Sequence, residues 1–466
     1  MMRYSFLAIG FLSCFFSLCY ADLASDVERF ARLPAFSYPQ ISPDGKQLAA
    51  TIIAGGKPLV VTQALISQAG ASDKPSKISA IKFGDLHLQG YEWVNNERLV
   101  FKTRTSVKNY GVRYNLTRMA AANYDGSNPV FLPMEKGMYG YSNYVGVVSR
   151  LKLEPEWILA ELDYEPETFF RRIHKVNVYT GKKVLVQKNK REIIHWIADA
   201  DGEVRIGVKL DYQSFKNYVR IWHRQSDKRE FKLLQKANYF DLDLLHPYRF
   251  DEENSNHLLV TSDNLLEGKE LLDFDDEGIY IYDLQKNEII GSYENHTKRK
   301  IKAQLKNVFK EKKIRFLSKD DSNSLHVIAT FSDTSPMEYF LYDLDKHKLS
   351  SLGKEYPRLD SAELRSMQEV NFAARDGTDI PAFLTLPKDG DGPWPLVVYP
   401  HGGPWAHDIW GFDNYVQFIA SRGYAVFQPQ FRGSTGYGQE HLSAGYGEWG
   451  NLIQDDITDG VNWLIE

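Results

Sequence analysis

The stretch Pro395–Gly438, PLVVYPHGGPWAHDIWGFDNYVQFIASRGYAVFQPQFRGSTGYG, decides the fold of the last part of the chain. Its apolar run Val397–Tyr399 predicts a strand buried on both faces of a parallel sheet. Apolar residues at helical spacing follow, Gly423 stands where that helix ends, and Tyr424–Gln428 predicts a second strand. Together they indicate a βαβ unit. Ligands bind at the carboxyl ends of such strands, so we expect chemistry at the loop 401–404, His-Gly-Gly-Pro.

Two adjacent glycines in this loop, Gly402 and Gly403, allow backbone N–H groups to approach a substrate closely. Donors directed at a developing negative charge form an oxyanion hole for acyl transfer. HGG-type loops have this role in α/β-hydrolases. The alternative is a tight turn with a structural role only.

The region from about Tyr38 to Arg358 has a different character, because short β-rich runs alternate with clusters of turn residues. A Pro-Asp-Gly turn at 43–45 leads into the strand Leu48–Ile53, and variants recur at 91–98, 198–203, 248–257 and 318–324. Aromatic strands that end in polar turns, such as Ile173–Tyr179, lie between them. Such repeats predict a β-propeller, of about seven blades at 40–50 residues each. An array of β-sandwiches is the alternative.

The composition is that of a soluble globular protein, with 466 residues and a net charge of −5, which gives no sign of nucleic-acid binding. Residues 1–21 resemble a secretory signal peptide, with Arg3 before the apolar run Tyr4–Leu18. A membrane anchor is the alternative. Both cysteines, Cys14 and Cys19, lie in this segment, so the processed chain would contain none. We expect a secreted or periplasmic protein with no membrane contact after cleavage.

Two charged segments outside the glycine loop have ordinary interpretations. His296–Ile314 carries many lysines opposite an apolar helical face, which predicts a packed helix with a solvated side; a polyanion site is the alternative. The acidic run Asp273–Glu277 lacks the spacing of a calcium loop. The sequence contains no phosphate-binding loop, dinucleotide fingerprint or cysteine–histidine metal pattern, so we expect no cofactor and no metal.

The order of the motifs in the last hundred residues resembles that of the prolyl oligopeptidase family of serine peptidases, nearest its acylaminoacyl-peptidase and dipeptidyl-peptidase-like branch. A hairpin across 375–378 (Arg-Asp-Gly-Thr) precedes YPHGGP, then FRGSTGYG, then Glu448-Trp449-Gly450. The resemblance implies a propeller followed by an α/β-hydrolase domain and a preference for short peptides. It also implies an oxyanion donor at Gly403, or at Gly402, in a loop shaped by His401 and Pro404. Residues 432–434, Arg-Gly-Ser, would flank the site.

The nucleophile that this resemblance requires is missing. A serine elbow needs Gly-x-Ser-x-Gly, and no two glycines in this chain stand four positions apart. Ser434 and Ser443 each have half of the motif, without a strand before them. A helix is predicted from near Asn451, with Ile453, Ile457, Val461, Leu464 and Ile465 on one face and the aspartates 455, 456 and 459 on the polar face.

In the family that the chain resembles, the elbow follows this helix, and the acid and the histidine come later. All three residues of the triad would therefore lie beyond residue 466, and we expect a fragment that is inactive alone. His401, His407 and His441 precede the elbow position and are expected to be loop or surface histidines.

We therefore expect a signal peptide at 1–21, a helical segment at 22–37, a propeller at 38–360 and an incomplete α/β-hydrolase domain at 361–466. The expected function is that of a serine peptidase acting on short peptides. Two other classes stay open: an esterase or lipase with the same HGG loop, and a non-catalytic periplasmic propeller that binds ligands. The oligomeric state and the mode of cleavage are not indicated by any motif.

Overall fold

The computed structural model covers residues 1–466 and describes residues 27–65, 78–109, 111–132, 143–163, 171–213, 216–225, 230–239, 241, 243–262, 278–387 and 392–466. The predicted signal peptide and the acidic run Asp273–Glu277 lie outside these ranges. Residues 27–30 form one helical turn, a part of the helix expected at 22–37. Within the described residues, no helix combines the length and apolarity needed to cross a membrane.

The described residues between 36 and 354 form six four-stranded antiparallel sheets, each a simple meander. The first three sheets contain β1 (Phe36–Ile41), β2 (Gln47–Ala54), β3 (Lys57–Ala64), β4 (Ile78–Ile81); β5 (His87–Trp93), β6 (Arg98–Asn109), β7 (Val112–Asn123), β8 (Val130–Phe131); and β9 (Asn143–Arg150), β10 (Trp157–Asp163), β11 (Arg171–Asn177), β12 (Lys183–Gln187).

The fourth to sixth sheets contain β13 (His195–Ala198), β14 (Val204–Gln213), β15 (Lys216–His223), β16 (Lys232–Asn238); β17 (His246–Phe250), β18 (His257–Thr261), β19 (Tyr280–Asp283), β20 (Glu288–Ser292); and β21 (Lys313–Lys319), β22 (Leu325–Ser332), β23 (Ser335–Asp343), β24 (Lys348–Lys354). The helix α3 (His296–Leu305) connects the fifth sheet to the sixth.

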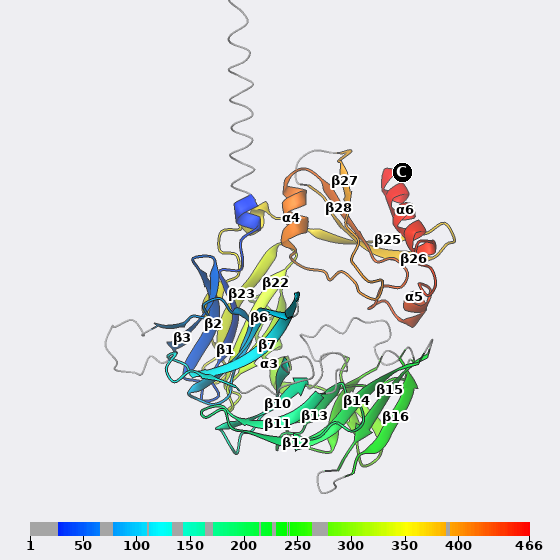
Figure 1. The fold of residues 1–466 in the computed structure, drawn as a ribbon. Helices are drawn as coiled ribbons and strands as arrows, with labels where there is room; N and C mark the ends of the chain where they lie inside the picture. Colours follow the sequence, from blue (N-terminus) through cyan, green and yellow to red (C-terminus); the bar gives the residue numbers. More distant parts are fainter. Residues whose placement is uncertain are drawn as a thin grey trace, which may run out of the picture.

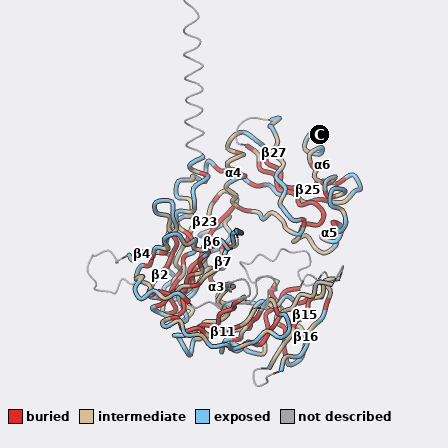
Figure 2. Tube along the Cα trace, in the orientation of Figure 1, coloured by how far each residue is buried: buried red, intermediate tan, exposed pale blue. Residues whose placement is uncertain are grey.

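The six sheets follow one another around an axis, as in a propeller (Figure 1). The first strands of neighbouring sheets contact one another, as β9 and β17 both contact β13. The last sheet returns to the first, because β1 contacts β21 and the Ile41 N–H donates to Ser318 Oγ at 2.9 Å. Buried residues run along the middle of the strands and exposed ones occupy the turns (Figure 2).

The predicted turns occupy the same place in the repeat. The turns at 43–45, 198–203, 248–257 and 318–324 each lead from the first strand of a sheet to the second. Their Asx side chains accept backbone N–H groups, as Asp320 Oδ1 does from Leu325 N at 2.8 Å. The described residues form six such sheets, against about seven predicted blades, because one repeat spans about 50 residues and α3 lengthens the connection between the last two.

The basic helix is shorter than expected. It ends at Leu305, and the predicted segment His296–Ile314 continues as turns and then as β21. Ile301 and Leu305 are buried against the sixth sheet, whereas Val308 is 59% exposed and does not belong to the apolar face. The side of α3 that carries lysines faces solvent, which agrees with a packed helix.

The α/β region contains one sheet in the order β25-β26-β28-β27, with strands β25 (Met367–Ala373), β26 (Asp379–Thr385), β27 (Leu396–Val398) and β28 (Ala425–Pro429). The 3-10 turn η1 (Ser361–Glu363) precedes it. Helices α4 (Asn414–Ser421), α5 (Gln439–Ser443) and α6 (Leu452–Ile465) accompany it. The pair β27–β28 is parallel, so the predicted βαβ unit and the hairpin across 375–378 are both confirmed.

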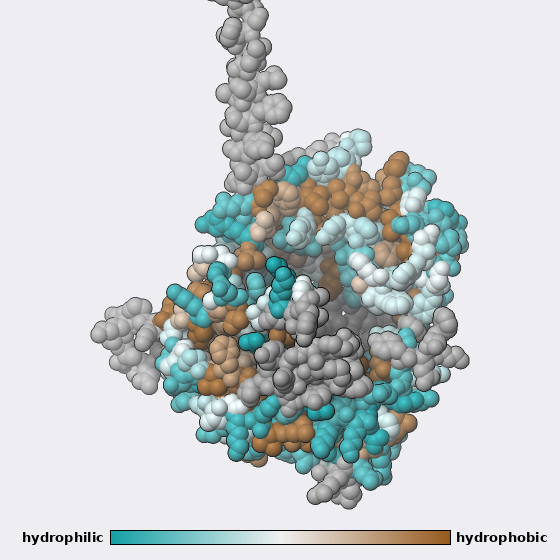
Figure 3. All heavy atoms as spheres, viewed as in Figure 1, coloured by the Kyte–Doolittle hydropathy of each residue, from teal (hydrophilic) through white to brown (hydrophobic). Residues whose placement is uncertain are grey.

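The strand β27 differs from its prediction. It is an edge strand of three residues, and all three are only half-buried, because in the described chain a neighbour, β28, pairs with it on one side alone. Every residue of β28, by contrast, is buried. In Figure 3, hydrophobic surface gathers over the upper part of the molecule, where Figure 1 places β27 and α4.

The α/β region is attached to the sixth sheet and to the N-terminal segment. Gln417 of α4 is buried, and its Nε2 donates to the carbonyls of Asp333 at 3.1 Å and Arg365 at 2.7 Å. The ring of Phe30 packs against that of Phe418 with centroids 5.8 Å apart. These contacts set the position of α4, which follows the glycine loop.

Candidate active site

The loop 401–404 begins three residues after β27, at the carboxyl end of that strand. Gly402 and Gly403 are exposed, and Pro404 is buried. Gly403 has φ +139°, and a Cβ built there would lie 2.7 Å from Trp405 N. A Cβ at Gly402 would meet nothing within 4 Å. The backbone therefore requires glycine at position 403 and not at 402.

His401 connects this loop to the segment 431–434. Its Nδ1 lies 2.8 Å from Gly402 O and its Nε2 lies 2.9 Å from Ser434 Oγ. The imidazole also stacks on the ring of Phe431, with centroids 4.4 Å apart and an interplanar angle of 21°. These three contacts fix the orientation of the ring.

The hydroxyl of Ser434 donates to Phe431 O at 2.6 Å, so its oxygen accepts from the imidazole. A carbonyl oxygen only accepts, so Nδ1 of His401 donates to Gly402 O. His401 thus contacts its own loop through Nδ1 and the segment 431–434 through Nε2, so the ring is held between the two segments.

Arg432 is buried and is held by two carboxylates, that of buried Asp456 and that of exposed Asp376. Its Nε and Nη2 donate to Asp456 at 2.8 and 2.6 Å, and its Nη1 donates to Asp376 at 2.8 Å. Its backbone N–H also donates to Asp456, at 3.0 Å. The side chains of Arg432 and Asp456 are 5% and 0% exposed. This network joins α6, the hairpin turn at 375–378 and the segment 431–434.

The charges in this network shift one another's titration. The side-chain hydrogen bonds to Asp456 and then to Asp376 raise the pKa of Arg432, although burial acts in the opposite direction. The hydrogen bond from Arg432 holds the pKa of Asp376 well below its usual range. Arg432 and Asp376 therefore stay ionised at neutral pH.

Backbone contacts also hold the loop 401–404 against the segment 431–434. A Cβ on Gly445 would lie 2.5 Å from the Cα of Gly433, so the chain beside α5 touches the segment 431–434 directly. Gly433 has φ +95° and faces Pro404, whose Cβ would lie 3.4 Å from an added Cβ. Thr435 N donates to Ala406 O at 3.0 Å. The predicted site residues 401–404 and 432–434 are therefore brought together in one unit.

Neither serine considered from the sequence is placed to attack a substrate. Ser434 lies beside His401 but is 0% exposed, and its hydroxyl is directed to a backbone carbonyl. Ser443 is exposed, on α5, and its hydroxyl donates to Glu440 O at 3.2 Å. A nucleophile needs both access to the substrate and a base within reach, and each serine lacks one of the two.

The predicted polar face of α6 is wrong for one of its aspartates. Asp455 and Asp459 pair with Arg375 at 3.0 and 2.9 Å near the surface, as a polar face would. Asp456 is instead buried with Arg432, and Ile465, expected on the apolar face, is 76% exposed. Compared with the prediction, α6 is rotated about its axis, so that its buried face includes Asp456 and Gly460.

Gly460 allows this rotation. A Cβ there would lie 2.6 Å from the ring of Phe427 and 2.7 Å from that of Phe372, so α6 approaches the sheet more closely than a side chain permits. An apolar periodicity alone did not show this, because glycine and aspartate carry no apolar signal.

The histidines beside the site have structural contacts. The Nε2 of His441 lies 2.9 Å from Gln430 O, so the expected loop histidine is part of the segment's support, and burial lowers its pKa. His407 Nδ1 lies 2.7 Å from Thr435 Oγ1. The sequence did not indicate three residues of the site, Phe431, Asp376 and Asp456. The one available signal was the Arg-Asp-Gly turn at 375–377, which contains Asp376 but served only as part of the family resemblance.

Comparisons with known proteins show what the chain resembles. Residues 410–466 match the profile of the Prolyl oligopeptidase family. Dipeptidyl aminopeptidase BIII of Pseudoxanthomonas mexicana is 26% identical over 96% of the chain, and dipeptidyl peptidase family member 6 of Caenorhabditis elegans is 26% identical over 63%. The chain spans 67% of the length of the first relative and 46% of the second.

Two solved structures share the fold at low sequence identity. A puromycin hydrolase matches 92% of the chain and 71% of its own, with a TM-score of 0.58 and 15% identity. A structure from a study of two prolyl endopeptidases matches 95% of the chain and 68% of its own, with a TM-score of 0.61 and 13% identity. These likenesses show the fold. The match over residues 410–466 and the peptidase relatives show that this chain is similar to the prolyl oligopeptidase family.

Proposed function

We propose that this chain supplies the propeller and the oxyanion-binding loop of a serine peptidase that hydrolyses short peptides by acyl transfer. The single observation that carries the proposal is the hydrogen bond between His401 Nδ1 and Gly402 O, 2.8 Å long. It orients the peptide plane between the two glycines.

The orientation follows from the geometry of a trans peptide, in which C=O and N–H point in opposite directions. With the Gly402 carbonyl directed at the imidazole, the Gly403 N–H points away from the imidazole, at an exposed residue. Within the described chain, no hydrogen-bond acceptor for this N–H is found. A donor fixed in advance and left unpaired is suited to stabilise a developing oxyanion.

The remaining site residues act in this proposal as positioning groups. Arg432 anchors the segment 431–434 on Asp456, Ser434 holds the imidazole of His401, and Gly433 packs against Pro404. The domain division at about residue 360 is part of the same proposal. It is supported by the end of the sixth sheet at Lys354 and the start of β25 at Met367.

The nucleophile, acid and base would come from outside these 466 residues, since they contain no Gly-x-Ser-x-Gly and no exposed serine–histidine pair was found in the described chain. We therefore expect the 466-residue chain alone to be inactive. A fluorophosphonate probe should leave it unlabelled. Covalent labelling of Ser434 or Ser443 would contradict the proposal.

The role of the loop is tested in the protein from the complete reading frame. His401→Ala should lower kcat for a dipeptide p-nitroanilide by about a hundredfold, with KM little changed, because the donor is used mainly in the transition state. His407→Ala is the matched control and should have a much smaller effect. Equal losses for the two variants, or a change in KM alone, would contradict an oxyanion role.

Two other functions are separated by the same assay. An esterase would hydrolyse p-nitrophenyl esters and leave peptide anilides intact, and a binding propeller would turn over neither. The relatives bear the names of dipeptidyl peptidases, which favours the peptide. Secretion or periplasmic export, proposed from residues 1–21, is tested by N-terminal sequencing of the protein from fractionated cells.

A further inference from the structure

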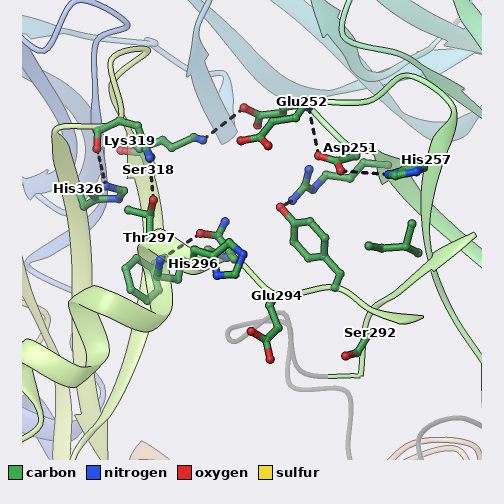
Figure 4. Close-up of a pocket in the computed structure, with 18 of the residues that line it drawn as sticks. Asp251, Glu252, His257, Ser292, Glu294, His296, Thr297, Ser318, Lys319 and His326 are labelled. Carbon is green, nitrogen blue, oxygen red and sulfur yellow. Dashed lines mark hydrogen bonds and ion pairs between the residues drawn. The ribbon is translucent and has the colours of Figure 1, made fainter. Parts of the chain in front are cut away.

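The carboxyl group of Asp408, in the loop that follows Pro404, contains a buried oxygen atom, Oδ2, that has no hydrogen-bond partner in the described chain. Carboxylates elsewhere have donors. In a polar cleft of about 750 Å³ between the fifth and sixth sheets, for example, Glu252 accepts from Lys319 Nζ at 3.3 Å, and the two side chains point toward each other (Figure 4). A buried carboxyl oxygen without a donor is unusual in a native protein.

A second buried acceptor without a partner belongs to the side chain that contacts Asp408. Gln428, on β28, is 2% exposed, and its Oε1 has no hydrogen-bond partner in the described residues. The same side chain is hydrogen-bonded to the carboxyl group of Asp408, where this bond is one of the influences on the pKa. Both residues lie in the stretch 392–466, which the structure describes without a gap. Each of the two planar groups thus has one bonded atom and one unpaired oxygen.

The backbone of Asp408 is fixed by Gln430. The Asp408 N–H donates to Gln430 Oε1 at 3.1 Å, and Gln430 Nε2 donates to Asp408 O at 2.8 Å. Gln430 is 0% exposed, and its own N–H donates to Pro381 O of β26 at 2.9 Å. Asp408 is therefore held against the sheet, with its carboxyl group beside Gln428.

The titratable groups that face this carboxyl group come from the loop, from the end of β27 and from the start of α4. They are His401, His407, Tyr399 and the N-cap residue Asp413. Burial raises the pKa of Asp408, and the charge of Asp413 acts in the same direction, whereas the two histidines and the bond from Gln428 oppose them. The balance is a raised pKa, which favours the protonated form.

A proton on Asp408 satisfies both unpaired oxygens. A protonated carboxyl group has one O–H donor and keeps one acceptor oxygen. Its O–H can donate to Gln428 Oε1 while Gln428 Nε2 donates to the other carboxyl oxygen, so that two parallel hydrogen bonds join the groups. Neutrality also suits the position, because an ionised carboxylate beside the loop would oppose the negative charge that develops on an oxyanion at Gly403.

We propose that Asp408 is a positioning residue that stays protonated, pairs with the amide of Gln428 and spares the candidate oxyanion loop a nearby negative charge. Its purpose rests on the proposed oxyanion role of Gly403. The proton remains on the carboxyl group throughout, so Asp408 is neither an acid nor a base in the reaction.

The protonation state is measured on the 466-residue chain, without turnover. Infrared difference spectra between the chain and Asp408→Asn at pH 7 isolate the carboxyl group that is lost, because a protonated carboxyl and a carboxylate absorb in separate bands. Asp455→Asn is the matched control, since Asp455 pairs with Arg375 near the surface. We expect Asp408→Asn to lose a protonated-carboxyl band and Asp455→Asn to lose a carboxylate band.

Loss of a carboxylate band in Asp408→Asn would overturn the proposal. An ordered water that donates to both oxygens, with Asp408 ionised, would give that result. Failure of Asp408→Asn to fold would also overturn it, because asparagine is neutral and offers Gln428 the same two hydrogen bonds.

The effect on catalysis is measured in the protein from the complete reading frame, with a dipeptide p-nitroanilide. Asp408→Ala should lower kcat at pH 7 by about tenfold, and Asp408→Asn should recover most of that loss. The ratio of kcat for Asp408→Asn to that for the wild type should rise by about tenfold as alkaline pH ionises Asp408 in the wild type.

A ratio that does not change with pH would overturn the proposal, and so would equal losses for the alanine and asparagine variants. The infrared measurement needs no peptidase activity. A failure of the proposed function and a failure of the protonated Asp408 are therefore distinguished.

Discussion

The propeller and the α/β region each contain a buried arginine, Arg98 and Arg432, in different surroundings. Arg98, at the start of β6, donates to Val178 O at 2.7 Å and Asn128 O at 2.9 Å, both neutral carbonyls. Arg432 donates almost entirely to the carboxylates of Asp456 and Asp376. Arg98 connects the second sheet of the propeller to the third. In the α/β region, Arg432 is the centre of an ion network that holds the candidate oxyanion loop.

The difference teaches which kind of interaction each region depends on. The propeller repeats one arrangement, and apolar clusters between sheets supply most of its cohesion. The α/β region also has an apolar cluster around Phe427, and Arg432 in addition positions its loops. Substitutions should therefore be most damaging at a carboxylate in one region and at an aliphatic side chain in the other.

The largest effect is expected from Asp456→Ala. It leaves Arg432 buried with one carboxylate fewer, which should destabilise the α/β region by about 3–5 kcal/mol. Hydrogen exchange of peptides from 425–434, followed by mass spectrometry, measures this. Asp455→Ala, which removes a surface partner of Arg375, should change the same exchange by about 0–1 kcal/mol. Similar values for the two variants would show that burial of the pair is unimportant.

The counterpart in the propeller is Leu258→Ala. Leu258 is fully buried in the cluster between the fourth and fifth sheets, so the cavity left behind should cost about 2–5 kcal/mol. Exchange in β14 and β18 should rise while that of 425–434 stays unchanged. Leu233→Ala, at a residue that is 47% exposed, is the control. Parallel loss of protection in the α/β region would mean that the two regions do not respond separately.

A smaller effect is expected from Gly403→Ala. Its φ of +139° and the approach of Trp405 N to 2.7 Å strain any side chain there, at about 1–3 kcal/mol. Gly402→Ala adds its Cβ in open space and should be nearly neutral. Exchange of peptides from 396–407 compares the two. A larger loss for Gly402→Ala would contradict the backbone conformation.

The smallest effect is expected in how the stability of the two regions depends on pH. Burial, with Arg205 nearby, lowers the pKa of His223 to about 4, whereas an unfolded histidine titrates near 6.5. Between these values the unfolded state binds more protons, so stability of the fourth sheet should be full above pH 6.5 and fall as pH decreases towards 4. His223→Gln should flatten this slope in β14 and β15 exchange.

The ion network of the α/β region should respond only at lower pH. The pKa of Asp376 is depressed by Arg432, so its contribution is present above about pH 4, the unfolded value for aspartate, and is lost as pH falls below it. In a background with His441→Gln and Asp408→Asn, which removes the two buried groups whose shifted pKa values would themselves respond below pH 6.5, exchange of 425–434 should therefore be constant from pH 6.5 to 4. A decline of both regions over one pH range would remove the distinction between the two arginine environments.

Much of the fold and part of the site could be predicted from the sequence. The turn at 43–45 marks its sheet because the strands on either side carry the periodicity of a β-hairpin. The sheet count and the end of α3 could not be read in this way, because repeat length and helix termination depend on packing against neighbours. The burial of Asp456 could not be predicted for the same reason. An aspartate on a helix is assigned to the solvent-exposed face, and its partner Arg432 is known only from the tertiary structure.

The sequence by itself determined the strand–loop–helix–strand order of 395–438, the glycine loop in it, and the absence of a serine elbow in the printed residues, because these depend on local chemistry and spacing. Only the tertiary structure decided that Gly403, and not Gly402, is conformationally constrained, and that His401, Ser434 and Arg432 form one support. The physical reason is that these contacts join residues 24 to 56 positions apart, and local conformational propensity does not depend on partners so distant in the sequence.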